Sequence, residues 1–280
     1  MGERKSTRVA VVSTKGGVGK TTVTANLGGL LADLGKRVLL VDADLQPTLS
    51  SYYSLANEAR LGLFEWLVSG ATEVVSRSEI ENLDIVASND PAAQLPNLLL
   101  HAPDGRTRLR FLLDQIDSEY DVTLIDTQGS VSALQDAAVL AADRLLSPVP
   151  PEMLSAREFG RGTLAMLDRL RTMERLGLPI APLSAFLNRV DRTRDAHQIA
   201  DALRHELKDR DGIQLLNTVI PNLVVYREAG RYGAPVHRYQ RSRPVALASG
   251  AAGDTMHSLA AELFPDWCHG EKSLAGTDRV

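Results

Sequence analysis

The feature that most constrains this chain is a glycine-rich stretch near its start, Ser13-Thr14-Lys15-Gly16-Gly17-Val18-Gly19-Lys20-Thr21-Thr22. Residues 8–13 before it are mostly apolar and β-branched, which predicts a buried parallel strand, and residues 24–34 after it carry apolar residues at helical spacing. A strand, a glycine-rich loop and a helix in this order form a phosphate-binding loop. Glycines let backbone N–H groups approach phosphate oxygens, and the start of the helix favours negative charge.

The residue types in this loop suit nucleotide chemistry. Lys20 is placed to reach the β- and γ-phosphates of a nucleotide, and the Thr21 hydroxyl is placed to bind Mg²⁺. The strict pattern G-x-x-x-x-G-K-[ST] is not met, because its first glycine falls on Thr14 and a second lysine, Lys15, follows at once. A turn without a ligand is nevertheless a poor explanation, since two lysines, three glycines and two threonines fall within eight residues.

Composition places the chain among ordinary soluble α/β proteins. Its 280 residues are 24% charged, carry a net charge of −4 and include one cysteine, Cys268. We expect a single domain over residues 1–280, with flexible tails at residues 1–7 and about 266–280. One cysteine excludes a disulfide within the chain and a four-cysteine cluster from one subunit. No segment has the character of a signal peptide or a membrane span, so we expect a cytoplasmic protein.

Segments with strand character alternate with helical segments along most of the chain. This alternation predicts a three-layer α/β fold, in which a mostly parallel twisted sheet carries helices on both faces. About seven strands are expected, at residues 8–13, 36–42, 83–87, 121–126, 144–149, 180–188 and 215–220. Helices are expected at residues 24–34, 61–68, 106–116, 153–176, 195–208 and 249–263.

Two of the predicted strands end in aspartate. Asp42 closes one strand, with Asp44 two residues later, and Asp126 closes another. Because the C-terminal ends of parallel strands meet at one edge of a sheet, these aspartates are expected beside the glycine-rich loop. Phosphoryl transfer needs cations on the phosphate oxygens, a hydroxyl and a carboxylate for Mg²⁺, and a group that orients the attacking water. We assign Asp126 to the Mg²⁺ site, Asp42 to its support and Asp44 to the water.

The three segments resemble the deviant Walker A, A′ and B motifs of the ParA/MinD family. The matching residues are Lys15-Gly16-Gly17-Val18-Gly19-Lys20-Thr21-Thr22, Leu40-Val41-Asp42-Ala43-Asp44 and Leu124-Ile125-Asp126-Thr127. Their order and spacing agree as well. The resemblance implies an ATPase that uses ATP and Mg²⁺, hydrolyses ATP weakly without a partner, and closes into a homodimer around the nucleotide. It also implies that Lys15 reaches the ATP of the other subunit and supplies charge to the transition state in trans.

Two further segments resemble the part of the family that holds the base. Asn188 resembles its adenine contact, and Ile220-Pro221 resembles its second segment beside the base. An asparagine at the end of a strand is also a common turn former, so the sequence leaves the role of Asn188 open.

The chain departs from the family pattern at two places. Gln128-Gly129 stands where the family usually has two prolines, so we expect a more flexible switch loop after Asp126. Asn222 and Val225 stand where the family usually carries arginines. Basic residues appear later in the sequence instead.

A basic run follows these positions. From Tyr226 to Arg243 there are five arginines and one acid, Glu228, which gives a net charge of +4 and leaves −8 for the rest of the chain. A localised basic stretch is typical of a nucleic-acid-binding face, although a solvated, ion-paired surface is the commoner meaning of a charge run. With the resemblance, it predicts salt-sensitive, non-specific binding of double-stranded DNA, with added contacts from Tyr226, Tyr232 and Tyr239. The predicted DNA-binding residues are Arg189, Arg192, Arg227, Arg231, Arg238, Arg241 and Arg243.

The favoured hypothesis is therefore a ParA/Soj-type DNA-partition ATPase associated with the nucleoid. Its ATP-bound dimer would bind DNA, and a ParB-like partner would stimulate hydrolysis and release. A MinD-like membrane-associated regulator is less favoured, because the C-terminus lacks a basic amphipathic helix. The single cysteine argues against an iron–sulfur reductase. A ParA-like ATPase that positions a conjugation complex or a protein cargo is not distinguished by the sequence.

Overall fold

The computed structural model describes residues 6–208, 210–241 and 251–268 of the chain. Its strands fall mostly on the apolar, β-branched runs of the sequence, because such side chains pack well on a buried pleated surface. The strands are β1 (Thr7–Val11), β2 (Val38–Ala43), β3 (Leu55–Asn57), β4 (Val75–Ser78), β5 (Leu83–Val86), β6 (Val122–Thr127), β7 (Arg144–Val149), β8 (Leu183–Val190) and β9 (Ile213–Pro221).

The strands form one sheet with the order β3-β4-β5-β2-β6-β1-β7-β8-β9. All pairs are parallel except those of β4, which runs antiparallel to β3 and β5. The predicted mostly parallel sheet is confirmed. The sequence missed β3 and β4 because these two strands near one edge of the sheet are short, partly exposed and carry no apolar run. Strand β1 leads into the glycine-rich loop and strand β6 carries Asp126. The two strands lie side by side near the centre of the sheet.

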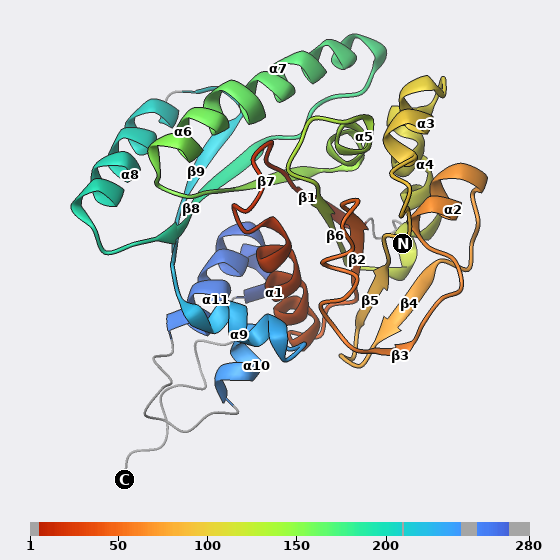
Figure 1. Ribbon diagram of the computed structural model, residues 1–280, viewed down its shortest axis with the longest axis horizontal. Helices are drawn as coiled ribbons and strands as arrows, with labels where there is room; N and C mark the ends of the chain where they lie inside the picture. The colour runs from red at the N-terminus through yellow and green to blue at the C-terminus, as the bar shows by residue number, and fades with distance from the viewer. Residues whose placement is uncertain (1–5, 209, 242–250, 269–280) are drawn as a thin grey trace.

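Helices occupy most of the connections between the strands (Figure 1). They are α1 (Lys20–Asp33), α2 (Leu63–Ser69), α3 (Leu95–His101), α4 (Gly105–Ile116), α5 (Ala133–Ala141), α6 (Met153–Glu158), α7 (Ala165–Leu170), α8 (Arg194–Leu207), α9 (Val224–Arg231), α10 (Val236–Arg241), α11 (Ala251–Leu263) and α12 (Pro265–Cys268). None of the helices among the described residues combines the length and apolarity needed to cross a bilayer.

The sheet buries side chains on both faces, which gives two hydrophobic cores. In the first strand, Val9 and Val11 point into the core formed with α1, α9, α10 and α11. Ala10 and Val12 point into the core formed with α2 to α8. This alternation explains why the central strands are mostly apolar on both faces, as expected for strands covered on both sides. Helices therefore cover both faces, as predicted (Figure 1).

Five helices were missed, α3, α5, α9, α10 and α12, and one was predicted too long. The sequence analysis did not find α5, because all nine of its residues are buried and no polar face marks the helical period. The helix predicted at residues 153–176 is interrupted by a π-helical turn, Phe159–Leu164, and ends in a 3-10 segment, Arg171–Leu176. The interruption lies beside the phosphate loop, where a Cβ on Gly162 would stand 2.1 Å from the Thr14 hydroxyl oxygen.

Both expected tails contain ordered residues. Ser6 is buried, and Thr7 already pairs with Val122 of β6. At the other end, Trp267 stacks on Phe264 with a ring separation of 4.4 Å, and the Lys36 ammonium lies 5.0 Å from the Trp267 ring. The structure thus extends to Cys268, two residues beyond the predicted start of the C-terminal tail.

Candidate nucleotide-binding site

The glycine-rich loop connects β1 to α1 at the C-terminal edge of the sheet. Gly17 and Gly19 have φ angles of +73° and +98°, in the left-handed region that side chains disfavour. Gly19 also caps α1, and a Cβ at this position would lie 2.5 Å from the Asn188 side-chain nitrogen. These two glycines are therefore required by the backbone path, and α1 begins at Lys20 with its N–H groups directed at the loop.

Lys20 is buried inside this loop, with 6% of its surface exposed. Its Nζ donates to the Lys15 carbonyl oxygen at 3.4 Å. Burial lowers the pKa of Lys20, while the carboxylates of Asp126 and Asp44 act in the opposite direction. An ammonium group without water around it and with acidic neighbours is well placed to hold phosphate oxygens.

Asp126 and Asp42 occupy paired positions on the neighbouring strands β6 and β2, and both are fully buried. Neither carboxylate oxygen of Asp126 accepts a well-formed hydrogen bond from any residue that the structure describes. Burial and the neighbouring Asp42 raise the pKa of Asp126 to about 8, although Thr21 and Lys20 act in the other direction. A buried carboxylate without partners is costly unless a cation satisfies it. Asp126 and the Thr21 hydroxyl therefore fit a Mg²⁺ site.

Asp42 differs from Asp126 because the protein itself satisfies its oxygens. The Ser50 backbone N–H and hydroxyl donate to Oδ2 at 2.7 and 2.6 Å, and the Asp44 N–H donates to Oδ1 at 3.2 Å. Burial is still the larger influence and raises the pKa of Asp42 to about 6. These contacts fix the start of the loop that carries Asp44, so Asp42 supports the site through its neighbours.

Asp44 lies just past the end of β2 and is partly exposed. Its Oδ1 accepts from the Gln46 N–H at 3.1 Å, and its carbonyl oxygen accepts from the Ser88 hydroxyl at 2.6 Å. These two hydrogen bonds hold Asp44 at the open edge of the site, where its side chain is partly exposed to water. That placement suits a group that orients an attacking water.

Lys15 points to a different part of the same subunit. Its Nζ donates to the Ser155 hydroxyl at 2.7 Å and lies 3.6 Å from Oε2 of Glu152. Ser155 in turn donates to Glu152 at 3.1 Å. The sequence analysis missed both partners, because they lie about 140 residues away in the chain and belong to no motif. The structure shows Lys15 held within its own subunit.

Asn188 and Pro221 meet in one pocket beside the phosphate loop. The pocket is lined by Gly19, Thr22, Val23, Asn188, Arg189, Ile220, Pro221, Asn222, Leu223, Tyr226, Arg227 and Met256. Asn188 is buried and donates to the Val18 carbonyl oxygen at 2.6 Å. Arg189 has a φ angle of +57°, and its guanidinium donates to the Gly17 carbonyl oxygen. This contact ties Arg189 to the phosphate loop.

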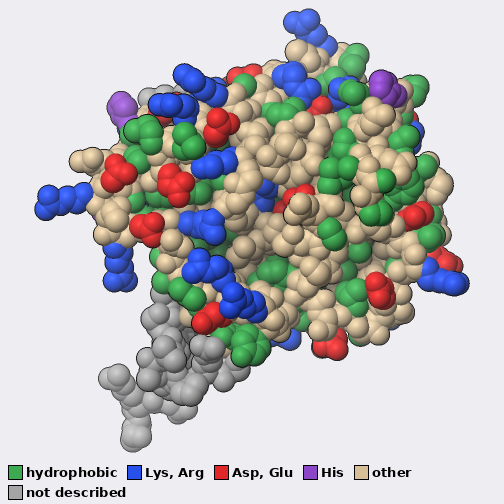
Figure 2. Space-filling view, viewed as in Figure 1, with side chains coloured by type: hydrophobic (Ala, Val, Ile, Leu, Met, Phe, Trp, Pro, Cys, Tyr) green, Lys and Arg blue, Asp and Glu red, His purple; other side chains and the backbone are tan. Residues whose placement is uncertain are grey.

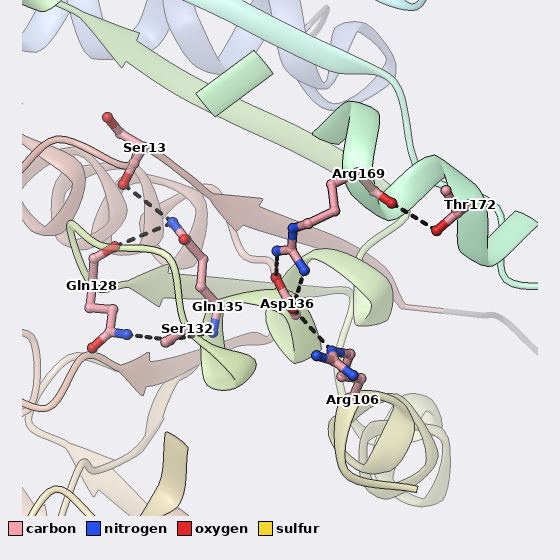
Figure 3. Close-up of polar contacts among 8 residues, drawn as sticks. All are labelled: Ser13, Arg106, Gln128, Ser132, Gln135, Asp136, Arg169 and Thr172. Carbon is pink, nitrogen blue, oxygen red and sulfur yellow. Dashed lines mark hydrogen bonds and ion pairs between the residues drawn. The ribbon is translucent and has the colours of Figure 1, made fainter. Parts of the chain in front are cut away.

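The switch loop after Asp126 makes several side-chain and packing contacts, and its predicted flexibility stays a prediction (Figure 3). Gln128 is 6% exposed, and its side-chain amide donates to the Ser132 hydroxyl. Ser132 also caps α5 by accepting from the Gln135 N–H at 3.1 Å. A Cβ on Gly129 would lie 2.6 Å from both Cα and N of Gly16, so the loop also touches the phosphate loop. Side-chain hydrogen bonds and close packing replace the stiffness that prolines would give.

The basic run contributes partly to the surface and partly to the core. Arg238 forms two hydrogen bonds with Asp33 at the end of α1, so its charge is already paired. Tyr226 and Tyr239 are buried, which corrects their predicted contact with DNA, whereas Tyr232 is 71% exposed. Arg192, Arg227 and Arg231 are exposed. The side chain of Arg241 and all of Arg243 lie outside the described residues.

Lys and Arg side chains gather on one side of the molecule (Figure 2). In this view they crowd the half that carries α6, α8 and α9, on the left. Arg227 and Arg231 of the basic run lie on α9, and Arg238, which is exposed but paired with Asp33, lies on α10. In the described ranges, no group of three or more His, Cys, Asp or Glu side chains is arranged to hold a metal ion.

The fold and the site define a P-loop nucleotide-binding protein with a deviant phosphate loop. A model of the AAA domain family matches residues 6–175. The sporulation initiation inhibitor protein Soj of Bacillus subtilis is 30% identical over 84% of this chain and 92% of its own length. The chromosome-partitioning ATPase Soj of Thermus thermophilus is 33% identical, over 87% and 92%.

The solved structures agree with this classification. The McdA–ATP complex of Cyanothece superposes with a TM-score of 0.78 at 20% identity, and the match covers 92% of this chain and 96% of McdA. The chain belongs to the AAA domain family and, within it, to the ParA/MinD group of deviant Walker A proteins. The resemblance stated from the sequence is thereby confirmed.

Proposed function

We propose that this protein is a ParA-type positioning ATPase, which hydrolyses ATP and binds non-specific DNA as an ATP-bound homodimer. The observation that carries the proposal is the buried Asp126, which lies close to Lys20 and Thr21 and whose oxygens accept no well-formed hydrogen bond from the described residues. That arrangement is unfavourable until a cation and phosphate oxygens complete it. The Soj relatives and the ATP complex of McdA support the same interpretation.

In this proposal the phosphate loop binds the triphosphate of ATP. Backbone N–H groups from Gly16 to Thr22 surround the phosphates, and Lys20 neutralises the β- and γ-phosphate oxygens. Asp126 and Thr21 hold Mg²⁺, which when bound neutralises charge that develops on the phosphates. The pocket containing Asn188 and Pro221 accepts the base, after Asn188 exchanges its bond with Val18 for one with the adenine.

Hydrolysis needs a positioned water and additional positive charge. Asp44 orients the water in line with the γ-phosphate, held in place by Asp42 and Gln46. Lys15 supplies the charge in trans, which requires a homodimer and the release of its bonds to Ser155 and Glu152. Because those bonds hold Lys15 in its own subunit, we expect slow hydrolysis by the isolated protein. A ParB-like partner would accelerate it.

DNA binding is assigned to the exposed arginines of the basic run and its neighbourhood. Arg192, Arg227 and Arg231 are available for phosphate contacts, whereas Arg238 is paired with Asp33 and Arg189 with the phosphate loop. Contacts with phosphates carry no base sequence information, so binding is non-specific and weakens as salt increases. The cellular consequence would be association with the nucleoid in the cytoplasm.

The first experiment compares three variants for ATP-dependent dimerisation, ATP turnover and retention on double-stranded DNA. Lys20→Ala should lose ATP binding and with it dimerisation and DNA retention. Asp44→Ala should bind ATP and remain as a DNA-bound dimer, because the water is no longer oriented. Lys15→Ala should bind ATP without closing productively. If ATP changes neither dimerisation nor DNA retention of the wild type, the proposal is wrong.

The second experiment tests the basic surface. The double variant Arg227→Glu/Arg231→Glu should lose DNA retention while keeping ATP-dependent dimerisation. The slope of log K against log salt should become shallower by about 0.9 for each DNA phosphate that the variant no longer neutralises. The matched control is Arg175→Glu, which reverses an exposed arginine in the 3-10 segment after α7 and should leave DNA retention unchanged.

A further inference from the structure

We propose that Gln135 is a positioning residue that couples the switch loop, residues 128–132, to the phosphate loop during ATP hydrolysis. The proposal rests on the proposed ATPase function and names a residue that belongs to none of the motifs identified above. Gln135 lies in the first turn of α5 and is completely buried. Such a residue has no access to solvent or to a partner protein, so its polar group acts only within the fold.

The Gln135 side chain bridges the two loops (Figure 3). Its Nε2 donates to the Ser13 carbonyl oxygen at 3.3 Å and to the Gln128 carbonyl oxygen at 3.4 Å. Ser13 is the residue where β1 passes into the phosphate loop, and Gln128 follows the last residue of β6. Because both partners are carbonyl oxygens, only the NH₂ end of the amide can face them. The orientation of the amide is thus determined by its surroundings.

The first turn of α5 is held in place by ion pairs of Asp136. Asp136, next to Gln135, is 3% exposed and accepts hydrogen bonds from Arg169 of α7 at 2.6 and 3.1 Å. It also accepts one from Arg106 of α4 at 3.1 Å. Figure 3 shows the two guanidinium groups meeting this carboxylate from opposite helices. With its backbone held in this way, Gln135 stays in place while the exposed part of the switch loop, Ser130 and Val131, can move.

A second contact joins the same two loops. The Gly129 backbone packs against the Gly16 backbone so closely that a Cβ at position 129 would lie 2.6 Å from Gly16 Cα. Thr127 adds a hydrogen bond from its hydroxyl to the Val11 carbonyl oxygen at 2.8 Å. A shift that begins at Asp126 therefore reaches Gln128 and Gly129 within three residues. At those two positions it acts on the phosphate loop, through Gln135 and through direct packing.

The second polar atom of the Gln135 side chain, Oε1, is the reason to infer a second position of the switch loop. Oε1 of Gln135 is buried and has no hydrogen-bond partner among the described residues. A buried acceptor without a donor is unfavourable, and the two bonds that Nε2 donates are long. Oε1 gains a donor only when the groups around it shift. Gln135 thus favours a second loop position, which we assign to the nucleotide-loaded state.

The test compares Gln135→Met, which keeps the volume but removes both polar atoms, with Gln135→Glu, which keeps the shape but removes the donor. Both variants should bind a fluorescent ATP analogue within about twofold of wild type, while kcat for ATP falls at least roughly tenfold, because only loop coupling is lost. The matched control is Gln115→Met on the exposed side of α4, with kcat unchanged.

Hydrogen exchange distinguishes coupling from stability, because its response to ATP would not change if Gln135 only stabilised the fold. In the wild type, ATP with Mg²⁺ should protect residues 13–17 and residues 128–132 together. In both Gln135 variants the phosphate loop should still gain protection while the switch loop does not. Wild-type kcat in both variants, or equal loss of protection in both segments, would overturn the proposal. If the wild type hydrolyses no ATP, the proposed function fails, yet the joint protection still tests the coupling.

Discussion

The unpaired carboxylate of Asp126 leads to a prediction about stability that is independent of any activity. In the nucleotide-free protein, Asp126→Asn should make the fold more stable at neutral pH. The substitution keeps the size of the side chain and removes an ionisable group that the folded protein keeps protonated at neutral pH. Keeping that proton costs free energy, because the unfolded chain releases it. Most substitutions at the centre of a site are expected to be neutral or destabilising, so the direction of this effect is diagnostic.

The magnitude follows from the difference in pKa between the folded and unfolded states. The pKa of Asp126 is about 8 in the folded protein and 3.8 in the reference state, so the folded state holds its proton over a range in which the unfolded state releases it. The stabilisation from this proton is complete below pH 4 and is lost as the pH rises to 8. One proton corresponds to about 1.4 kcal/mol per pH unit. Between pH 5 and pH 7 the advantage of Asp126→Asn should therefore grow by about 3 kcal/mol.

The assay is urea unfolding of wild type and variant at pH 5 and pH 7, followed by circular dichroism. Burial is the main cause of the raised pKa of Asp42, so we expect its contribution to be similar in the two proteins and largely to cancel in the difference. The control is Asp211→Asn, which removes an exposed carboxylate and should change the free energy of unfolding by the same small amount at both pH values. ATP with Mg²⁺ should raise the stability of the wild type more than that of Asp126→Asn.

Two results would refute this reasoning. One is a stability difference between wild type and Asp126→Asn that does not change with pH, which would mean that the carboxylate is satisfied in the folded protein. The other is a variant that is less stable at pH 7 than at pH 5 relative to wild type. Either result would also weaken the assignment of Asp126 to Mg²⁺, since that assignment depends on an unsatisfied carboxylate.

Three further predictions concern contacts away from this carboxylate. Gly129→Ala should weaken ATP binding by roughly tenfold, measured by titration with a fluorescent analogue, because its methyl group displaces the Gly16 backbone. Asp33→Ala should lower the free energy of unfolding by about 1 kcal/mol, because it releases Arg238, and an unchanged urea midpoint would contradict this. Arg8→Met should cost about 2–3 kcal/mol in the same assay, because the buried guanidinium bonds two carboxylates from α4 and the turn after it.

The phosphate loop and the ends of β2 and β6 could be predicted because their information is local. A contiguous run of glycines, lysines and threonines between a strand and a helix has few other structural meanings. The carboxyl ends of parallel strands meet at one edge for any sequence, so Asp42, Asp44 and Asp126 had to lie near the loop. The alternation of strands and helices predicted the layers for the same reason, whereas the short strands β3 and β4 and the helices α3, α5, α9, α10 and α12 were missed.

Tertiary structure alone decided which of these polar groups are already satisfied. Asp42 and Asp126 are the same residue type at paired positions, yet only Asp42 is reached by Ser50, which comes from a loop eight residues later. Lys15 is held by Ser155 across 140 residues, and Arg238 by Asp33 across 205 residues. A sequence records the charge of each side chain but not the partner that folding brings to it. For that reason the location of the site could be predicted from the sequence. The hydrogen-bond partners of Asp126, Lys15 and Gln135 could be determined only from the tertiary structure.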